Sequence, residues 1–351
     1  SPEILEEYIL IKKAAVPTSE ASDLDLYRVA SGETPVKTVH TISNKQVRLT
    51  LNLWKEAIEN EVIYGLEEKN AIERYSGDEL ESLWTWIGDE DYVLIPGKGV
   101  FTVKPEKKFK ARGVACGYKV EITGVELYAS GVEAATFRIC VRLAVLQEWE
   151  IVITDVGTAF LNAELDLPYK VIVSAPQIFI DAEVCKPGEL WLVKKAIYGL
   201  RESPRAWNDH RDRFLRECVI IHENQIYKLR QCVTDRSLWT IEPRPTHLLI
   251  RILPVAVRLQ IRAYLGSTTA GFVLTYVDDM LVTASKKLAA TVIMAITNQW
   301  TCTTPEVRSD CGTITFCSMK LVLRHNGNVL IVQDDYISEM LDRRQMSGLN
   351  P

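Results

Sequence analysis

The sequence lacks the patterns that mark membrane-spanning and exported proteins. Nowhere in its 351 residues does a run approach the ~20 uncharged apolar residues of a membrane helix. The most apolar stretch, Leu248 to Leu265, is interrupted by Pro254 and three arginines. The first residues, Ser1 to Glu7, are acidic, show no signal-peptide pattern and lack an initiator methionine. We therefore expect an intracellular protein without a membrane partner, and a piece of a longer chain.

Cysteine and histidine are too scattered to form a metal-ligand pattern. The eight cysteines include no Cys-x-x-Cys pair, and none of the five histidines has zinc-ligand spacing to them. We therefore expect reduced thiols and no zinc. Internal repeats and low-complexity tracts are absent too. With 47% hydrophobic and 25% charged residues, the composition is that of a globular chain with a sizeable core.

Positive charge is scarce in the first quarter of the chain and clustered later. Residues 1–91 carry 19 acidic and nine basic side chains, a net charge of −10, so that residues 92–351 carry +5 of the total −5. Clustered lysine and arginine can neutralise phosphates, whereas a solvated charged face is the ordinary alternative. The two basic clusters are Lys104, Lys107, Lys108, Lys110 and Arg112, and Lys194, Lys195, Arg201, Arg205, Arg211, Arg213 and Arg216.

Strands and helices are mixed without strict alternation, which favours an α+β fold. We predict an irregular leader over 1–50, a helix from Leu53 to Glu68 and a buried helix from Val132 to Gln147. Trp84 to Lys98 reads as a short strand that a Pro-Gly turn closes, followed by two strands around a basic turn up to Tyr118.

The second half of the chain offers clearer boundaries. A strand from Glu150 ends in Asp155, and a hairpin over 272–283 carries two acids at its tip. Ser203 as N-cap and Pro204 in the first turn open one helix, and Ser285 caps another that runs to about Trp300.

The acids at the hairpin tip are Asp278 and Asp279, in the sequence Tyr276-Val277-Asp278-Asp279. Adjacent carboxylates repel each other unless a cation neutralises them, and their hard oxygens suit Mg²⁺. The bland alternative is that aspartate is simply a good turn residue.

Asp155 supplies a third carboxylate at a strand end, within D-V-G-T-A-F-L-N at 155–162. Alone, it could be a capping aspartate followed by a core Phe160. Three carboxylates on neighbouring strand ends are the minimum set for phosphoryl transfer with two Mg²⁺ ions.

Together these motifs resemble the reverse transcriptases of copia-type LTR retrotransposons. Between the two acidic motifs lies K-A-I-Y-G-L-R-E-S-P-R-A-W at 195–207, which is similar to that class's specific signature. F-K-A-R-G-V-A-C-G at 109–117, F-C-S-M-K at 316–320 and Q-D-D-Y-I-S-E-M-L at 333–341 resemble further segments, all in the family's order.

The resemblance implies a role for each matching residue. Asp155, Asp278 and Asp279 would be the catalytic, metal-binding carboxylates. Phe160 would exclude a ribose 2′-hydroxyl and so select dNTPs. The remaining nucleotide-site residues would be Lys110 and Arg112 at the triphosphate, Val156 through its carbonyl, and Gly199, Ser203 and Pro204 beneath template and base. Tyr276, Val277 and Arg205 would face primer and template.

The family also implies a right-hand polymerase, with fingers, a ferredoxin-like palm that carries the carboxylates, and a partial thumb. We divide the chain into an acidic leader and helix over 1–83, fingers and palm over 84–300, and a partial thumb or connection over 301–351. Departures are Gly113, Cys116, Cys317 and Ser318 at motif positions, and the unmatched segment 242–271.

Three functions use these residues. The first is an RNA-directed DNA polymerase from a Pol polyprotein, which extends a primer on an RNA or DNA template in cytoplasmic virus-like particles. The second is a decayed remnant that at most binds nucleic acid. The third, a Mg²⁺-dependent nuclease or phosphatase, needs neither the Ser203-Pro204 motif nor Phe160. The sequence leaves the oligomeric state open.

Overall fold

The computed structural model describes residues 40–104, 108–119, 127, 129, 131–244, 269–324 and 327–343. The chain divides into two compact units. Unit 1 comprises 1–121, 167–200 and 339–351, and unit 2 comprises 122–166 and 201–338. Within the described residues, no helix is long and apolar enough to cross a membrane.

Unit 1 is a mixed sheet with helices. Its strand order is β1-β3-β6-β7-β2, with β4 added alongside β3. The core beside the sheet contains an edge-to-face contact between the Trp54 and Phe101 rings, whose centroids lie 5.1 Å apart. The strands are β1 (His40–Ile42), β2 (Ile72–Tyr75), β3 (Tyr92–Lys104), β4 (Lys108–Ala115), β6 (Lys170–Ser174) and β7 (Leu190–Val193). The helices are α3 (Asn44–Leu49), α4 (Leu51–Glu59), the π-helix η1 (Asn60–Glu67), α5 (Glu79–Ile87), η3 (Gly117–Lys119) and α7 (Gln177–Asp181).

Strand β3 continues through Pro96 and Gly97, where we predicted a turn, so that prediction was wrong. The strand changes partner at this point. Residues 92–96 pair in parallel with β6, whereas residues 97–104 pair antiparallel with β4. A Cβ on Gly97 would collide with the carbonyl oxygen of Ser174, so only glycine lets the neighbouring backbone approach this closely. Pro96 lacks an N–H, but its carbonyl accepts from the N–H of Cys116 at 2.8 Å.

Two other expectations for unit 1 need correction. The irregular leader over 1–50 contains β1 and α3, and residues 1–39 lie outside the described part of the chain. Ser43 and Gln46 form a reciprocal capping box that starts α3, a local signal we did not use. Trp84 belongs to α5 and not to a strand, because the helix buries Leu83 and Ile87. The predicted helix from Leu53 to Glu68 is confirmed as α4 and η1.

Unit 2 is built on an antiparallel sheet with the strand order β13-β5-β12-β11-β10-β9-β8. Its strands are β5 (Glu150–Asp155), β8 (Val219–His222), β9 (Gln225–Gln231), β10 (Leu238–Arg244), β11 (Gly271–Tyr276), β12 (Asp279–Ala284) and β13 (Glu306–Val307). Its helices are α6 (Ala134–Leu146), η4 (Ala159–Asn162), α8 (Ser203–Glu217), α11 (Lys286–Gln299) and α12 (Arg308–Cys311). A second sheet comprises β14 (Thr313–Phe316), β15 (Met319–Leu323) and β16 (Val329–Val332), and α13 (Asp334–Arg343) follows.

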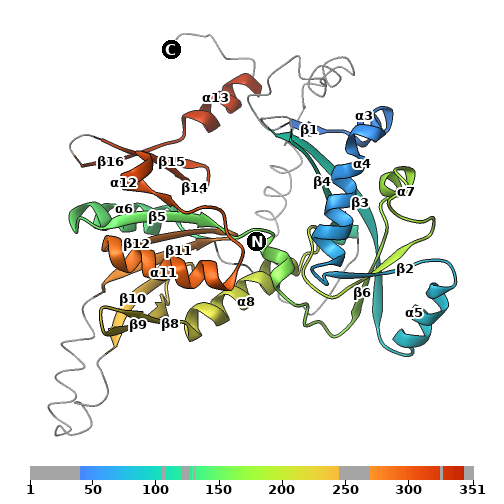
Figure 1. The fold of residues 1–351 in the computed structure, drawn as a ribbon, viewed down its shortest axis with the longest axis horizontal. Coiled ribbons are helices and arrows are strands. Elements are labelled where there is room, and N and C mark those ends of the chain that lie inside the picture. The colour runs from blue at the N-terminus through green and yellow to red at the C-terminus, as the bar shows by residue number, and fades with distance from the viewer. Residues whose placement is uncertain are drawn as a thin grey trace, which may run out of the picture. The chain divides into compact units, whose positions relative to one another are not determined.

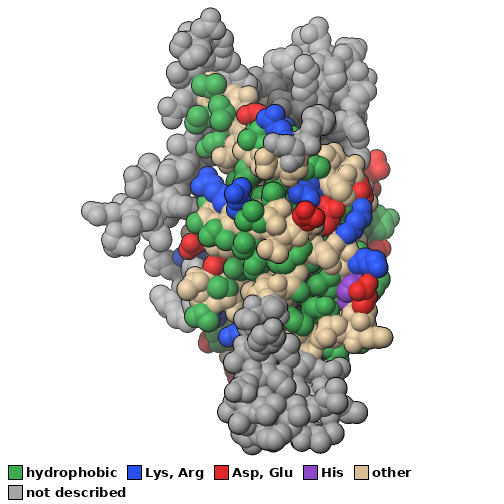
Figure 2. Space-filling view, turned by 90° about the vertical axis from the view of Figure 1, so that its left-hand side faces the viewer, with side chains coloured by type: hydrophobic (Ala, Val, Ile, Leu, Met, Phe, Trp, Pro, Cys, Tyr) green, Lys and Arg blue, Asp and Glu red, His purple; other side chains and the backbone are tan. Residues whose placement is uncertain are grey.

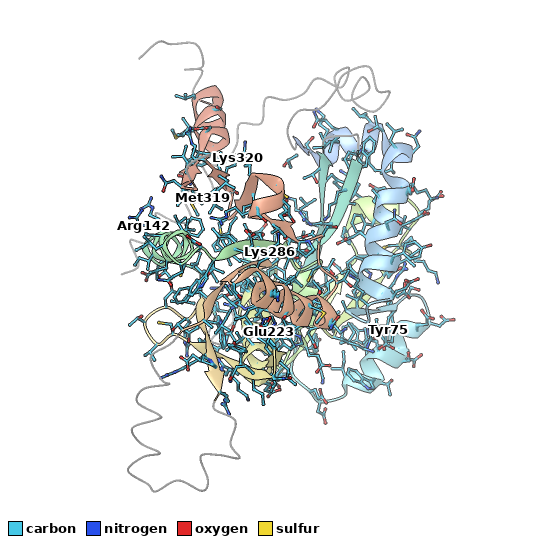
Figure 3. All side chains as sticks on the ribbon, turned by 60° about the vertical axis from the view of Figure 1, so that its left-hand side comes forward. Tyr75, Arg142, Glu223, Lys286, Met319 and Lys320 are labelled. Carbon is cyan, nitrogen blue, oxygen red and sulfur yellow. The ribbon has the colours of Figure 1, made fainter. Side chains whose placement is uncertain are left out.

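The two faces of the main sheet are covered by different elements. Helix α6 and the small β14–β16 sheet pack on the face that presents Ile151, Ile153 and Leu281, and the Phe137 and Phe316 rings stack with centroids 5.5 Å apart. Met319 of β15 is partly buried against this core. Figure 3 labels Met319, together with Arg142 on α6. Helix α11 contacts β5 and β12 and lies across the sheet from α6 (Figure 1). Both strands that carry the predicted carboxylates are therefore held between two layers.

Two predictions for unit 2 are confirmed: the acidic hairpin is β11 and β12, and Ser285 is the N-cap of α11. The helix predicted from Val132 to Gln147 is present as α6, but it buries only one face, since Ile139 and Leu146 are each 58% exposed. Helix α8, however, starts at Ser203 itself, with Glu202 in the N-cap position. Pro204 needs no N–H partner and so fits inside the first turn. Most of the unmatched segment 242–271 lies outside the described residues, but its ends belong to β10 and β11, which are hydrogen-bonded neighbours.

Candidate active site

The register of the main sheet brings the predicted carboxylates to one end of two adjacent strands. Asp155 is the last residue of β5, and Asp279 is the first residue of β12. These two residues are direct antiparallel partners, and Asp279 also pairs with Tyr276 across the β11–β12 turn. Directly opposite residues in an antiparallel pair have Cβ atoms about 4.5–5.5 Å apart. Asp278 lies within the same turn, one residue before Asp279.

The β11–β12 turn has a strained backbone. Val277 has φ of +52°, a left-handed conformation that is rare for a β-branched residue. The next carbonyl, of Asp278, accepts from the N–H of Val156 at 2.9 Å and so ties the turn to the end of β5. From α8, Trp207 Nε1 donates to the Val277 carbonyl at 2.5 Å, and Arg211 Nη1 reaches the same oxygen at 3.4 Å.

Negative charge accumulates at this end of the sheet. Burial, followed by the charges of Asp278, Asp155 and Glu306, raises the pKa of Asp279 to about 6, although a hydrogen bond from the backbone of Cys317 opposes this shift. That hydrogen bond runs from the Cys317 N–H to Asp279 Oδ2 at 3.3 Å. A cation would offset this repulsion, so the donor set fits a hard divalent ion that prefers oxygen ligands.

The carboxylates do not form a closed ligand cage. Among the described residues, no group of three His, Cys, Asp or Glu side chains is arranged to hold a metal ion. The assignment of Asp155, Asp278 and Asp279 as metal ligands therefore stays a prediction. The three residues share one end of the sheet.

The segment after Asp155 is held in place from two sides. The Asp155 N–H donates to Thr303 Oγ1 at 3.0 Å, and the Gly157 N–H donates to the Thr301 carbonyl at 2.8 Å. Val156 is fully buried. Thr158 then takes a left-handed conformation and starts η4, which carries the half-buried Phe160. Phe160 is thus placed five residues beyond Asp155 by a tightly hydrogen-bonded turn.

Helix α8 carries the next group of predicted site residues. The helix contacts η4, and its first turn includes the fully buried Ser203, followed by Pro204 and Arg205, which are half-buried. Arg205 Nε lies 3.2 Å from Asp209 Oδ2, one helical turn along. Unit 2 therefore holds ten of the thirteen predicted site residues: Asp155, Val156, Phe160, Ser203, Pro204, Arg205, Tyr276, Val277, Asp278 and Asp279.

The other three, Lys110, Arg112 and Gly199, belong to unit 1. Lys110 and Arg112 lie on β4, and the Arg112 guanidinium lies 5.1 Å from the Tyr198 ring centroid. Gly199 has φ of +88°, and a Cβ there would collide with the Ala115 carbonyl. The glycine of the 195–207 motif is thus required by its backbone.

One member of the second basic cluster, Arg211, is not on the surface. It has 0% exposed area and pairs with Asp212 at 2.8 Å, so neither a phosphate contact nor a solvated face describes it. In unit 1, Lys194 Nζ lies 2.6 Å from Glu73 Oε2 and Lys195 Nζ donates to the Lys69 carbonyl. Acidic and basic side chains are interspersed among the described residues on the face in Figure 2. Burial therefore excludes Arg211 from phosphate binding, whereas Lys194 and Lys195 have partners within unit 1.

Sequence reasoning missed three contributors to the site. Trp207 reads as one member of an apolar stripe, yet its indole N–H holds the acidic turn. Cys317 and Thr303 supply hydrogen bonds to Asp279 and Asp155 from segments far along the chain. Trp207 lies in the same motif as Ser203 and Pro204, and this could have indicated that it belongs to the site. The contacts of Cys317 and Thr303 depend on tertiary packing and have no local sequence signal.

Comparison with known sequences agrees with this geometry. Residues 86–231 match the family described as "Reverse transcriptase (RNA-dependent DNA polymerase)". This segment belongs to the reverse transcriptase family. It includes β5 with Asp155, η4 with Phe160 and all of α8, whereas the turn that carries Asp278 and Asp279 lies beyond the matched residues.

Three curated relatives are Pol polyproteins of transposons. The chain is 25% identical over 262 residues to the "Retrovirus-related Pol polyprotein from transposon RE1" of Arabidopsis thaliana, covering 69% of this chain and 15% of that protein. It is 35% identical over 102 residues to that from transposon RE2 of the same plant, covering 28% and 7%. It is 30% identical over 167 residues to that from transposon TNT 1-94 of Nicotiana tabacum, covering 42% and 12%. The copia-type resemblance of the reverse transcriptase domain is thereby confirmed, although the chain spans a small part of each relative.

Proposed function

We propose that this reverse transcriptase domain is an RNA-directed DNA polymerase that extends a primer with dNTPs, using two Mg²⁺ ions. The observation that carries the proposal is the register that sets Asp155 opposite Asp279, with Asp278 in the adjoining turn. Burial and neighbouring carboxylates raise the pKa of Asp279 to about 6, so the site concentrates negative charge that a bound cation would neutralise. Bound Mg²⁺ would activate the primer hydroxyl and stabilise the leaving group.

The chain's own groups then orient the reactants. Asp155, Asp278 and Asp279 would hold the ions, with the Val156 carbonyl beside them. The aromatic ring of Phe160, fixed on η4, would exclude a 2′-hydroxyl from the incoming nucleotide. Ser203, Pro204 and Gly199 would support template and base, whereas Tyr276, Val277 and Arg205 would face primer and template. Lys110 and Arg112 would attract the triphosphate electrostatically.

We propose further that the described units correspond to parts of a right-hand polymerase. The antiparallel sheet of unit 2, between α6 and α11, would be a ferredoxin-like palm, and the mixed sheet of unit 1 would supply the fingers. In the division by sequence, 84–300 would hold fingers and palm and 301–351 a partial thumb or connection, after the 1–83 leader. The domain would act inside the cell, in cytoplasmic particles, on an RNA or DNA template with a primer.

The test is dNTP incorporation on an RNA template with an annealed DNA primer in Mg²⁺. We expect extension by the wild-type chain and a loss of at least a hundredfold in the Asp278→Asn variant, because the variant removes one carboxylate charge from the metal site. Glu306→Gln is the matched control, since it removes a carboxylate charge near Asp279 without touching the proposed ligands.

Two results would contradict the proposal. Release of nucleotides without added dNTP would indicate the nuclease alternative. A folded protein that binds template and primer but never extends it would indicate a remnant. One observation favours the remnant: Cys317 and Ser318, at motif departures, form a turn with φ of +50° and +61°, a conformation that glycine or asparagine adopts more readily.

A further inference from the structure

We propose that Trp207 and Arg211 are positioning residues, which hold the β11–β12 turn so that Asp278 and Asp279 keep their catalytic geometry. This inference rests on the proposed polymerase function, because the turn carries two of its three carboxylates. Neither side chain would touch substrate. Both would act through a single backbone atom, the carbonyl oxygen of Val277.

The contact between α8 and the turn converges on that oxygen. Trp207 Nε1 donates to it at 2.5 Å, and Arg211 Nη1 approaches it at 3.4 Å. Both side chains have 0% exposed area. In a buried environment a hydrogen bond is stronger, and an unpaired carbonyl is costly, so the pair of donors fixes the orientation of this peptide group.

The carbonyl belongs to the residue that most needs holding. A φ of +52° at Val277 places a β-branched side chain in the left-handed region, which is sterically unfavourable for such a residue. Such a conformation persists only where its surroundings stabilise it. If the Val277 peptide relaxed, Asp278 and Asp279 would change direction, since they follow it directly in the chain.

A polar network behind the turn fixes the arginine in turn. Arg211 Nε and Nη2 donate to Asp212 Oδ1 at 3.1 and 2.8 Å. Gln231 Nε2 of β9 donates to Asp212 Oδ2 at 2.7 Å. Asp212 therefore holds the Arg211 guanidinium in place. Through Asp212 and Gln231, the turn is also linked to β9 of the same sheet. Arg211 is buried and hydrogen-bonded to its partners, so it is suited to hold the turn in place and not to bind a phosphate.

The same cluster offers a matched control. Trp300 packs edge-on against Trp207 with centroids 5.3 Å apart, is 4% exposed, and its Nε1 has no hydrogen-bond partner within the described residues. Trp207→Phe and Trp300→Phe therefore remove the same atoms from adjoining sites. Only the first removes a hydrogen bond to the turn.

The experiment measures single-nucleotide incorporation and Mn²⁺ binding for both variants. For Trp207→Phe we expect kcat to fall about tenfold with the dNTP KM within twofold, and Mn²⁺ affinity to fall severalfold. Trp300→Phe should retain both values. Val277→Asn should restore part of the loss in the Trp207→Phe background, because asparagine adopts the left-handed region more readily than valine.

Equal losses in the two tryptophan variants would overturn the proposal, since packing alone would then explain them. If the wild-type chain extends no primer, the polymerase function fails, but the Mn²⁺ titration still decides the positioning role. Weaker binding in Trp207→Phe alone supports that role, and unchanged binding contradicts it. Arg211→Lys, which keeps the charge but loses the fork, should behave as a milder version of Trp207→Phe.

Discussion

At the scale of single residues, the site depends on the strand register and the backbone hydrogen bonds that position its carboxylates. Asp155 and Asp279 are sequence-visible acids, but their pairing arises from a register between strands more than a hundred residues apart in the chain. Phe160 is set by a local turn, with Thr158 in the left-handed region before η4.

Phe160→Ala is expected to weaken sugar selection. The variant removes the ring that would occupy the space of a 2′-hydroxyl, so rNTP incorporation should rise at least tenfold relative to dNTP incorporation. The ratio of kcat/KM for a dNTP and the matching rNTP measures it. Leu161→Ala, a neighbouring buried truncation on the same short helix, is the control for general damage. An unchanged ratio in Phe160→Ala would rule out a role of Phe160 in excluding the 2′-hydroxyl.

Glu61 should make unit 1 less stable as the pH rises. Burial raises the pKa of this carboxyl above its ordinary value of 4.5, although the Gly113 N–H donates to it at 3.0 Å. Below pH 4.5 both states are protonated; above it, the unfolded chain loses its proton first, so stability falls until the pH passes the raised folded pKa.

Glu61→Gln keeps an acceptor for Gly113 but cannot ionise. Compared with wild type, its free energy of unfolding should decline less between pH 4 and pH 7, as urea denaturation at a series of pH values would show. Glu68→Gln, an exposed position just beyond the same π-helix, serves as the control. Parallel wild-type and Glu61→Gln curves would contradict this reasoning.

At the scale of elements, hairpins and helices hold the site from several directions. The β11–β12 hairpin carries two acids, α8 holds its turn, and the β14–β15 hairpin donates an N–H to Asp279. The last of these hairpins has a two-residue turn, Cys317 and Ser318, with both residues at positive φ. The pairing of β14 with β15 forces the two turn residues into this conformation, because a two-residue turn that joins twisted antiparallel strands requires positive φ.

Ser318→Gly should therefore stabilise the β14–β15 hairpin. Glycine adopts a φ of +61° without the steric cost that a Cβ imposes, so we expect about 1 kcal/mol more unfolding free energy. Thermal and urea unfolding would measure it. Ser318→Ala keeps the Cβ and so should bring no such gain, and equal effects of the two variants would show that conformational strain is not the cause.

At the scale of the whole molecule, two units each have their own sheet and core. All eight cysteines are free, and they differ widely in exposure. Cys311 is exposed, whereas Cys140 and Cys185 are buried, and burial raises the pKa of each of these two thiols to about 12. Thiolate is the reactive form, so the folded chain should discriminate strongly among its thiols.

Native labelling with iodoacetamide should therefore proceed in a defined order. Cys311 is expected to react rapidly, and Cys140 and Cys185 should react at least a hundredfold more slowly, at rates that report opening of the folded units. Peptide mass spectrometry against time would give the order, with fully denatured protein as the reference for equal reactivity. Rapid labelling of Cys140 in the native protein would contradict the buried core described for α6.

The sequence by itself determined the family resemblance and much of the element pattern. Strand ends at Asp155 and the 276–279 turn, the Ser203-Pro204 helix start and the Ser285 cap are local signals, because period, capping and turn preference act over a few residues. The family resemblance is carried by ordered motifs of the same local kind, and it is confirmed over 86–231.

Only the tertiary structure decided which of these residues meet. It buried Arg211, which charge counting places on a surface, because α8 turns that face toward the acidic turn. It also carried β3 through Pro96 and Gly97, since a parallel partner and an antiparallel partner follow one another along a single strand. Register, partner choice and burial depend on contacts between distant segments, which local sequence preferences do not encode.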